Sequence, residues 1–159
     1  MDAEHDPNED AVRELGHLNV HWLSLIGISL LLTTSAQAVS IRAYLIRATN
    51  DSKATDARLK DIEPLLKIRF GYQHYQLLGV RQEPFKGHNV HRLNLGEGFV
   101  VFVTPKSSSQ QRHELDVEWT SGRASLMKTT VRIKENKYLF VKGPGVGDDW
   151  IVLAVTVCE

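Results

Sequence analysis

The dominant pattern from residue 39 onward is the alternation of apolar and polar side chains that is typical of β-strands. In residues 39–48 the side chains of Ile41, Ala43 and Leu45 fall on one face. The same alternation predicts further strands at residues 72–81, 90–95, 99–104, 113–120, 124–134, 137–142 and 150–158. The last of these is almost wholly apolar, which predicts a central place in a sheet.

A helical pattern interrupts the strands after the turn residues 49–52. Its apolar positions recur near one helical face: Leu59, Ile62, Leu65, Leu66 and Phe70. Asp56 can cap the start of the helix. Pro64 lies inside the segment and predicts a kink or a separate short first turn, and Gly71 ends the helix.

The connections between strands are rich in glycine and polar residues. Residues 96–98 predict a tight hairpin turn, residues 105–111 a polar surface loop and residues 143–149 a glycine-rich loop. About eight strands with one early helix predict a mainly β fold, a single-domain β-sandwich or open barrel. The alternative is an α+β fold of two layers, with the helix covering one sheet.

An apolar run at residues 22–32 is followed by the small-x-small triplet Ala36-Gln37-Ala38. This pattern predicts a signal peptide at residues 20–38, cleaved before Val39, and therefore a bacterial protein in the periplasm or outside the cell. The alternative is a leader that is retained as a membrane anchor, but the run is shorter than the about 20 residues that span a bilayer.

Residues 1–19 do not fit a signal peptide, because they hold six acidic residues and one basic residue where a positive segment is expected. We consider a translation start at Leu18 or Val20, which would remove the acidic residues. The alternative is an acidic extension whose composition does not favour folding. The predicted organisation is thus an acidic extension at 1–19, a signal peptide at 20–38 and one β-rich domain at 39–159.

The charge balance changes when residues 1–38 are removed. The remaining chain has 18 basic and 13 acidic residues, a net charge of about +5. Its basic residues are scattered along the chain, so we predict no nucleic-acid partner. The single cysteine, Cys158, cannot form an internal disulfide and is expected to be a small apolar side chain at a strand end.

Four segments carry a resemblance to other proteins: Ala-Thr-Asn-Asp at 48–51, Leu-Lys-Asp-Ile-Glu-Pro-Leu-Leu at 59–66, Phe-Gly-Tyr at 70–72 and Tyr-Gln-Leu-Leu at 75–78. Together they resemble a group of small exported bacterial proteins of uncharacterised function. The resemblance covers most of residues 39–157 and implies export and a single domain. It implies no catalytic or binding residues.

Two histidines, His88 and His91, are close enough in sequence to share a metal ion, with His74 or His113 completing a set. On an extended strand, however, positions three apart point to opposite faces. We therefore expect solvated loop histidines and predict neither a metal nor a cofactor.

The glycine-rich segment at 143–149 ends in Asp148 and Asp149. Glycine loops bind phosphate where their amides converge at the start of a helix. Here a strand follows, and the two carboxylates would repel an anion. We expect a hairpin connection, with Asp148 and Asp149 as candidate binding residues only.

Three acids alternate along one strand face: Glu114, Asp116 and Glu118. Carboxylates so arranged could serve in glycoside hydrolysis. The next strand presents Lys128, Thr130, Arg132 and Lys134 at the same alternation. If the two strands form a hairpin, opposite charges face each other and stabilise the sheet, and this is the interpretation we favour.

Aromatic residues could bind carbohydrate or peptide if exposed: Tyr44, Tyr72, Tyr75, Phe85 and Phe99. We expect most of them in the core and keep Tyr72 and Tyr75 as candidate binding residues.

No serine lies in a nucleophile-elbow motif, and Cys158 has no neighbouring base. The sequence therefore favours an exported, non-catalytic module that binds another protein, an envelope protein or a peptide, by strand addition. The alternative is a small secreted hydrolase that uses carboxylates and histidines. Membrane contact is expected only through an uncleaved leader, and the sequence does not predict the oligomeric state.

Overall fold

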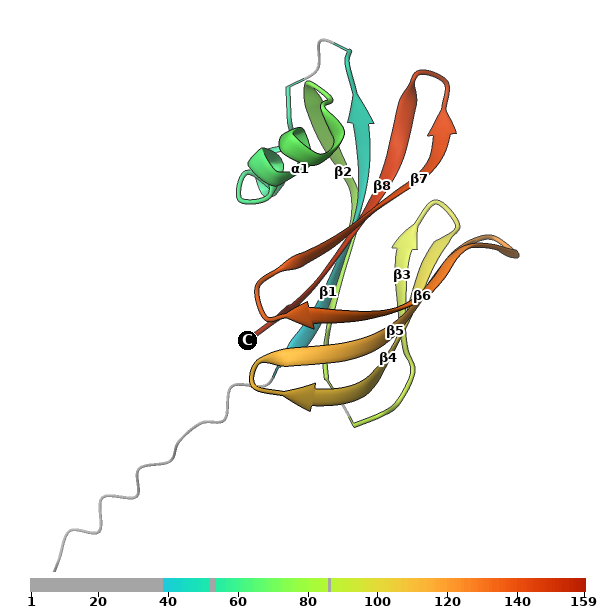
Figure 1. The fold of residues 1–159 in the computed structure, drawn as a ribbon. Coiled ribbons are helices and arrows are strands. Elements are labelled where there is room, and N and C mark those ends of the chain that lie inside the picture. Colours follow the sequence, from blue (N-terminus) through green and yellow to red (C-terminus); the bar gives the residue numbers. More distant parts are fainter. Residues whose placement is uncertain (1–38, 52–53, 86) are drawn as a thin grey trace, which may run out of the picture. The chain divides into compact units, whose positions relative to one another are not determined.

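Eight strands of the described residues form two antiparallel sheets of four strands each (Figure 1). The computed structural model describes residues 39–51, 54–85 and 87–159. The chain divides into two units between residues 35 and 36, and every described residue belongs to the second. The strands are β1 (Ser40–Thr49), β2 (His74–Pro84), β3 (His91–Gly96), β4 (Phe99–Ser109), β5 (Arg112–Ser121), β6 (Ala124–Lys134), β7 (Tyr138–Val146) and β8 (Asp149–Cys158). The helices are the 3-10 helix η1 (Ala57–Leu59) and the α-helix α1 (Glu63–Phe70).

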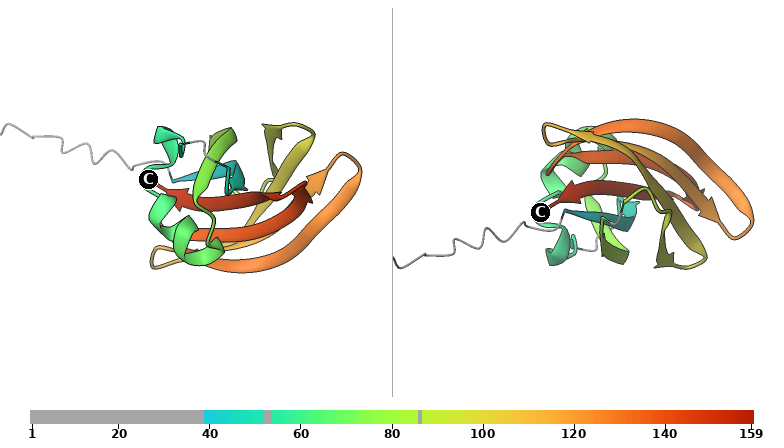
Figure 2. Two further views of the ribbon diagram at one scale, coloured as in Figure 1. Left: turned by 90° about the horizontal axis from the view of Figure 1, so that it is seen from above. Right: turned by 90° about the horizontal axis from the view of Figure 1, so that it is seen from below.

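Sheet A has the strand order β2-β1-β8-β7, and sheet B has the order β3-β4-β5-β6. The chain passes from sheet A to sheet B after β2 and returns after β6, and both layers can be followed from above and below in Figure 2. The predicted mainly β fold with one early helix is confirmed, as a two-sheet sandwich rather than a closed barrel. Cys158 is buried at the end of β8 and is a free thiol.

The predicted signal peptide at residues 20–38, its cleavage site and the acidic residues 1–19 lie outside the described residues and stay predictions. Among the residues that the structure describes, no helix is long and apolar enough to cross a membrane.

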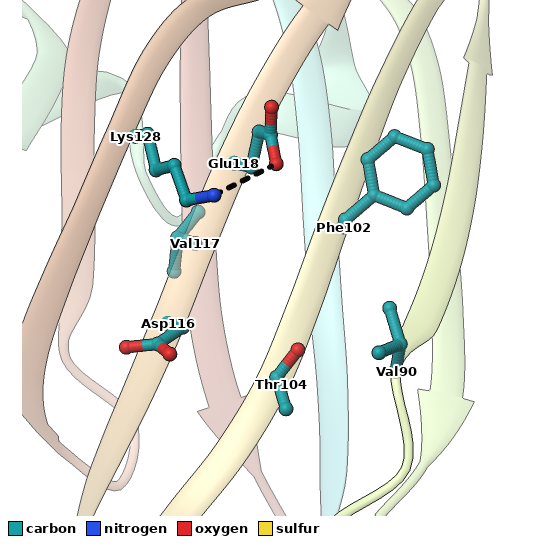
Figure 3. A pocket seen from close by; sticks show the side chains of 7 residues that line it. All are labelled: Val90, Phe102, Thr104, Asp116, Val117, Glu118 and Lys128. Atoms are coloured by element: carbon teal, nitrogen blue, oxygen red, sulfur yellow. Dashed lines mark ion pairs between the residues drawn. The ribbon is translucent and has the colours of Figure 1, made fainter.

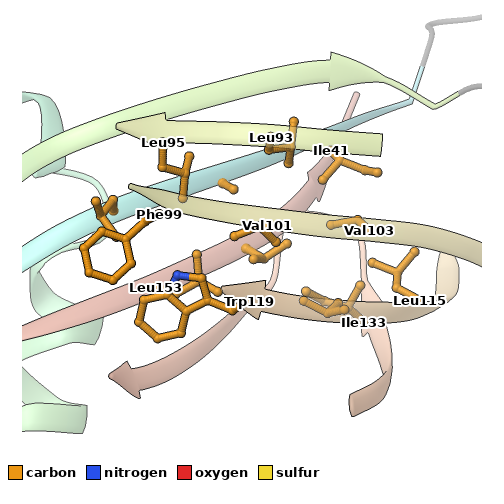
Figure 4. Close-up of a cluster of buried hydrophobic side chains, with 14 of the residues drawn as sticks. Ile41, Leu93, Leu95, Phe99, Val101, Val103, Leu115, Trp119, Ile133 and Leu153 are labelled. Atoms are coloured by element: carbon orange, nitrogen blue, oxygen red, sulfur yellow. The ribbon is translucent and has the colours of Figure 1, made fainter. Parts of the chain in front are cut away.

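The main core lies between the inner faces of the two sheets (Figure 4). Ile41 and Leu153 of sheet A pack there with Val101 and Trp119 of sheet B. All four side chains are buried completely. Removing a side chain of this size from water contributes about 1.5–3 kcal/mol, so this cluster holds the two sheets together.

The outer face of sheet A is covered by the helical segment. Tyr44, Ile46 and Ala48 alternate along β1 with the residues of the main core and pack against Leu59 and Leu66. Since both faces of sheet A are covered, the inner strands β1 and β8 are buried on both sides. This confirms the central position predicted for the last strand.

The local sequence explains how the helical segment begins and ends. The Asp56 side chain accepts a hydrogen bond of 3.0 Å from the backbone N–H of Arg58, which caps η1 as predicted. Pro64 lies in the first turn of α1, where no backbone N–H is needed, so the predicted short first turn before the main helix is confirmed. Gly71 adopts a φ of 75° and ends α1 in the left-handed conformation that glycine favours.

The predicted buried face of the helix is wrong at one position. Leu66 is buried completely, whereas Leu65 is 45% exposed. The helical segment is interrupted between η1 and α1, so α1 does not continue the direction of η1. In α1 it is Leu66 that points toward sheet A. Leu65 is turned away from that direction by about 100°, the rotation per residue of an α-helix.

Most of the predicted polar loop at residues 105–111 is strand. β4 continues to Ser109, and after a register shift between Pro105 and Ser107 it pairs Ser107 with Glu114 of β5. Backbone groups pair in a sheet whatever the polarity of the side chains, so the polar sequence did not indicate where the strand ends.

The predicted glycine-rich loop at residues 143–149 is also mostly strand, because β7 continues to Val146. The register with β8 shifts between Lys142 and Gly145. A Cβ at Gly143 would collide with the Trp119 ring, so the glycine lets β7 approach this core side chain.

Aromatic side chains lie mostly in the core, as expected. Tyr44, Tyr75 and Phe99 are buried, and Tyr72 and Phe85 are half-buried. The Tyr75 hydroxyl donates a hydrogen bond of 2.9 Å to the backbone oxygen of Leu66, which fixes α1 on sheet A.

Candidate functional site

Two of the three acids of β5 face basic residues of β6 directly, as the alternation predicted. Glu114 is paired in register with Arg132, and Glu118 with Lys128. The Arg132 Nε lies 2.7 Å from Glu114 Oε2, and the Lys128 Nζ lies 3.8 Å from Glu118 Oε2. These cross-strand ion pairs stabilise the hairpin, which gives Glu114 and Glu118 a structural role.

Asp116 has different partners from its neighbours. The Thr130 hydroxyl donates a hydrogen bond of 2.6 Å to Asp116 Oδ1, and the Lys106 Nζ lies 2.9 Å from Oδ2. The hydrogen bond from Thr130 has the larger effect, and together with that from Lys106 it lowers the pKa of the Asp116 carboxyl. Asp116 is therefore held as a carboxylate by β4 and β6, and it does not face Arg132.

The outer face of sheet B, here called the sheet B face, carries a shallow depression of about 290 Å³ (Figure 3). The Phe102 ring and Val90 lie on one side of it, and Asp116, Glu118 and Lys128 lie on the other. Val90 is 62% exposed. The depression thus joins an apolar surface to charged groups from β5 and β6.

β6 forms one border of the sheet B face and is an edge strand. In the described sheet order it has a neighbour on one side, β5. Its burial pattern runs from exposed to half-buried along all 11 residues except Ile133. Lys128, Thr130 and Arg132 point to the sheet B face, and the side chains between them are half-buried.

The structure separates the two predicted candidate histidines. His88 is exposed, and its Nδ1 lies 3.0 Å from the backbone oxygen of Pro105. His91 is 6% exposed, so the expectation of a solvated loop residue is wrong for it. Its Nδ1 lies 3.4 Å from Glu83 Oε2, because β3 begins at His91 and turns the side chain inward.

His113 lies in a polar cluster that the sequence did not indicate, in which the imidazole is buried and Ser108 is exposed. Its Nε2 lies 2.8 Å from Glu135 Oε1 and its Nδ1 lies 3.1 Å from Ser108 Oγ. The Phe85 ring packs against both His113 and His91, with centroid distances of 5.3 and 6.2 Å. Ser108 and His113 are register partners, but Glu135 joins them from the turn after β6.

The candidate tyrosines are not displayed together on a binding surface. Tyr75 is buried completely and cannot contact a ligand without unfolding. Tyr72 is half-buried next to the main helix, and the Lys142 Nζ lies 5.8 Å from its ring centroid. The same ammonium lies 3.7 Å from the Trp150 ring centroid, a cation–π contact that holds Lys142 over sheet A.

The candidate acids Asp148 and Asp149 lie at the turn between β7 and β8. Asp148 is an exposed turn residue, and Asp149 is the first residue of β8 and pairs with Val146. Within the described residues, no three His, Cys, Asp or Glu side chains are arranged to hold a metal ion. The turn is the hairpin connection that the sequence led us to expect, although it is shorter.

Comparison with known proteins adds no family to this picture. No family model, no curated protein and no solved structure matches the chain significantly. The resemblance to small exported bacterial proteins stays a prediction.

Proposed function

We propose that this chain is an exported, non-catalytic module that binds another protein, and that the partner adds a strand to β6. The observation that carries the proposal is the edge position of β6, an 11-residue strand with a described neighbour on one side only. The backbone groups along such an edge are a template for a further strand.

The other edge strands of the described sheets are less suited to strand addition. β2 and β3 approach each other so closely that a Cβ at Gly79 would collide with the backbone oxygen of Leu95. In β7 the register breaks between Lys142 and Gly145, and Pro144 has no N–H to donate.

The side chains of β6 define the partner segment. Lys128, Arg132 and Lys134 would repel a second copy of β6 and attract carboxylates. On the other face of the strand, Met127 and Val131 are half-buried and would pack against apolar side chains. The segment that fits is extended, with acidic and apolar residues in alternation.

The small secreted hydrolase is the second candidate, and the bonded series Ser108–His113–Glu135 favours it. A hydroxyl, an imidazole and a carboxylate in hydrogen-bond contact are the groups that activate a serine nucleophile. The same bonds also satisfy a buried imidazole, which supports a structural role. The acids and histidines that the sequence suggested for this activity are gathered only in part. His113 and Glu114 line one depression, whereas Asp116 lines the depression of the sheet B face. Glu114 also pairs with Arg132, and His91 pairs with Glu83.

A peptide-binding experiment tests strand addition. A short peptide that alternates Glu and Val should bind the full-length chain, and the amide hydrogens of β6 should then exchange more slowly with solvent. The same peptide with alternate backbone nitrogens methylated should not bind, since it lacks the N–H donors. Equal binding of the methylated peptide, or unchanged exchange in β6, would contradict the proposal.

A charge reversal on β6 tests the partner's chemistry. Lys128→Glu should weaken binding of the Glu-Val peptide and strengthen binding of a Lys-Val peptide. Lys60→Glu, an equal change in charge next to η1, should alter neither. If both variants weaken binding equally, net charge rather than β6 governs the interaction.

Two further experiments test the remaining parts of the proposal. N-terminal sequencing of the mature protein should begin at Val39, and a retained leader would contradict cleavage. Labelling by a fluorophosphonate, which reacts with activated serines, should leave Ser108 unmodified. Stoichiometric labelling that Ser108→Ala abolishes would favour the hydrolase instead.

A further inference from the structure

The outer face of sheet A carries a depression that is distinct from the sheet B face. It has a volume of about 330 Å³ and lies where β1 and β2 meet η1. Arg42, Arg58 and Arg81 line it, and no acidic residue is among the lining residues. Tyr44, Leu77, Val80 and Gln82 supply the rest of the surface. The depression therefore combines three cationic residues with an aromatic and aliphatic surface.

The register of β1 with β2 brings four of these residues together. Arg42 of β1 is paired with Gln82 of β2, and Tyr44 is paired with Val80. Residues two apart on a strand share a face, so all four point away from the main core.

The Arg42 guanidinium is fixed within the depression. Its Nε donates a hydrogen bond of 2.7 Å to Gln82 Oε1, and its Nη1 donates one of 3.3 Å to the Tyr44 hydroxyl. Neither bond uses Nη2. A guanidinium held in this way loses little conformational freedom when it binds an anion.

Arg58 is brought to the same depression by η1. The backbone N–H of Asp56 donates to the Tyr75 oxygen at 2.9 Å, which attaches the start of η1 to β2. The Asp56 carboxylate then accepts from Arg58 Nε at 2.9 Å and from Nη2 at 2.6 Å. These contacts orient Arg58 and leave its Nη1 unused.

We propose that this depression binds a small amphiphilic anion, with its carboxylate or phosphate group at Arg42 and Arg58 and its apolar part on Tyr44, Leu77 and Val80. Planar guanidinium groups recognise oxyanions through paired hydrogen bonds. The aliphatic surface favours an anion that carries an apolar body over a bare inorganic ion. The site lies on the sheet opposite β6, so it is independent of strand addition.

The test titrates the purified full-length chain with octyl phosphate, octanoate, octanol and inorganic phosphate. The two amphiphilic anions should bind, and the Nε–Hε resonances of Arg42 and Arg58 should shift in NMR spectra. Added salt should weaken binding. Octanol and inorganic phosphate should bind at least tenfold more weakly. If octanol binds as tightly as the amphiphilic anions, the arginines do not contribute to binding. If inorganic phosphate does, the apolar surface does not contribute. Either result overturns the proposal.

Substitutions locate the site. Arg42→Gln and Arg58→Gln should each weaken octyl phosphate binding about tenfold, the effect of losing a charge-assisted hydrogen bond. Arg92→Gln, the same change on an exposed residue of β3, should leave binding unchanged. Arg42→Lys keeps the charge and should still weaken binding, because a lysine lacks the planar fork. Unchanged affinity in both glutamine variants, with the fold intact by NMR, would overturn the assignment.

Discussion

The Nε of Arg132 lies 2.7 Å from Oε2 of Glu114, directly across the β5–β6 pair. Arg132 is 80% exposed at its side chain and Glu114 is 27% exposed. Water and salt screen an ion pair in such a position, so it contributes little to stability although its N–O distance is short.

A double-mutant cycle on Glu114→Ala and Arg132→Ala should therefore give a coupling free energy below about 1 kcal/mol. The coupling should shrink further in high salt, as measured by urea denaturation. The matching cycle on Asp116 and Arg132 should show no coupling, because Asp116 bonds to Thr130 and Lys106 instead. A coupling between Glu114 and Arg132 that salt does not change would contradict this account.

The alternation of apolar and polar residues was enough to predict this hairpin, but not the partner of every side chain. Acids and bases at every second position fit any register that is shifted by two residues. Only the observed pairing shows that Asp116 faces Thr130 and Glu114 faces Arg132. For the same reason, the sequence indicated a charged sheet face without indicating its bonds.

Residues joined by turns and helix breaks were harder to predict. Ser108, His113 and Glu135 come together through a register shift in β4 and the turn after β6, and neither leaves a periodic pattern. The depression lined by Arg42 and Arg58 depends on how η1 attaches to β2, a contact between distant segments. The alternation of apolar and polar residues therefore predicted the strands and the class of fold, but not these clusters.

Leu66 and Leu65 provide a matched pair for testing the orientation of α1. Leu66→Ala should lower the free energy of unfolding by about 2–5 kcal/mol, because it leaves a cavity against sheet A. Leu65→Ala should change it by about 0.5 kcal/mol or less, since Leu65 is 45% exposed. Urea denaturation of both variants checks the difference, and a larger loss at Leu65 would show that the helix is turned the other way.

Gly79 controls how closely β2 and β3 approach. Gly79→Ala places a Cβ against the backbone oxygen of Leu95, which cannot rotate away as a flexible side chain could. We expect a loss of about 1–3 kcal/mol in the free energy of unfolding, the usual range for overpacking. Gly145→Ala is the control, because its nearest neighbours would lie at 3.7 Å, an ordinary contact. Equal stability of the two variants would mean that β2 and β3 do not approach each other closely at Gly79.

Asp56 makes part of the stability depend on pH. The hydrogen bond from the Arg58 side chain, together with that from the Arg58 backbone, lowers the pKa of the Asp56 carboxyl from 3.8 to about 2. A carboxyl whose pKa is lower in the folded than in the unfolded chain stabilises the fold above the unfolded value. That contribution disappears as the pH falls from about 4 to about 2, because the folded protein must then take up the proton as well.

The test is Asp56→Asn, which keeps a side-chain oxygen to cap η1 but removes the charge. The free energy of unfolding of the unsubstituted chain should exceed that of the variant near pH 6, and most of this difference should be lost by about pH 2. Asp61→Asn, at an exposed position in the same segment, controls for the loss of one negative charge. High salt should reduce the difference near pH 6, since the Arg58 side chain is 67% exposed. A difference close to zero at both pH values would mean that Asp56 stabilises η1 through its cap alone, and that the ion pair with Arg58 contributes nothing.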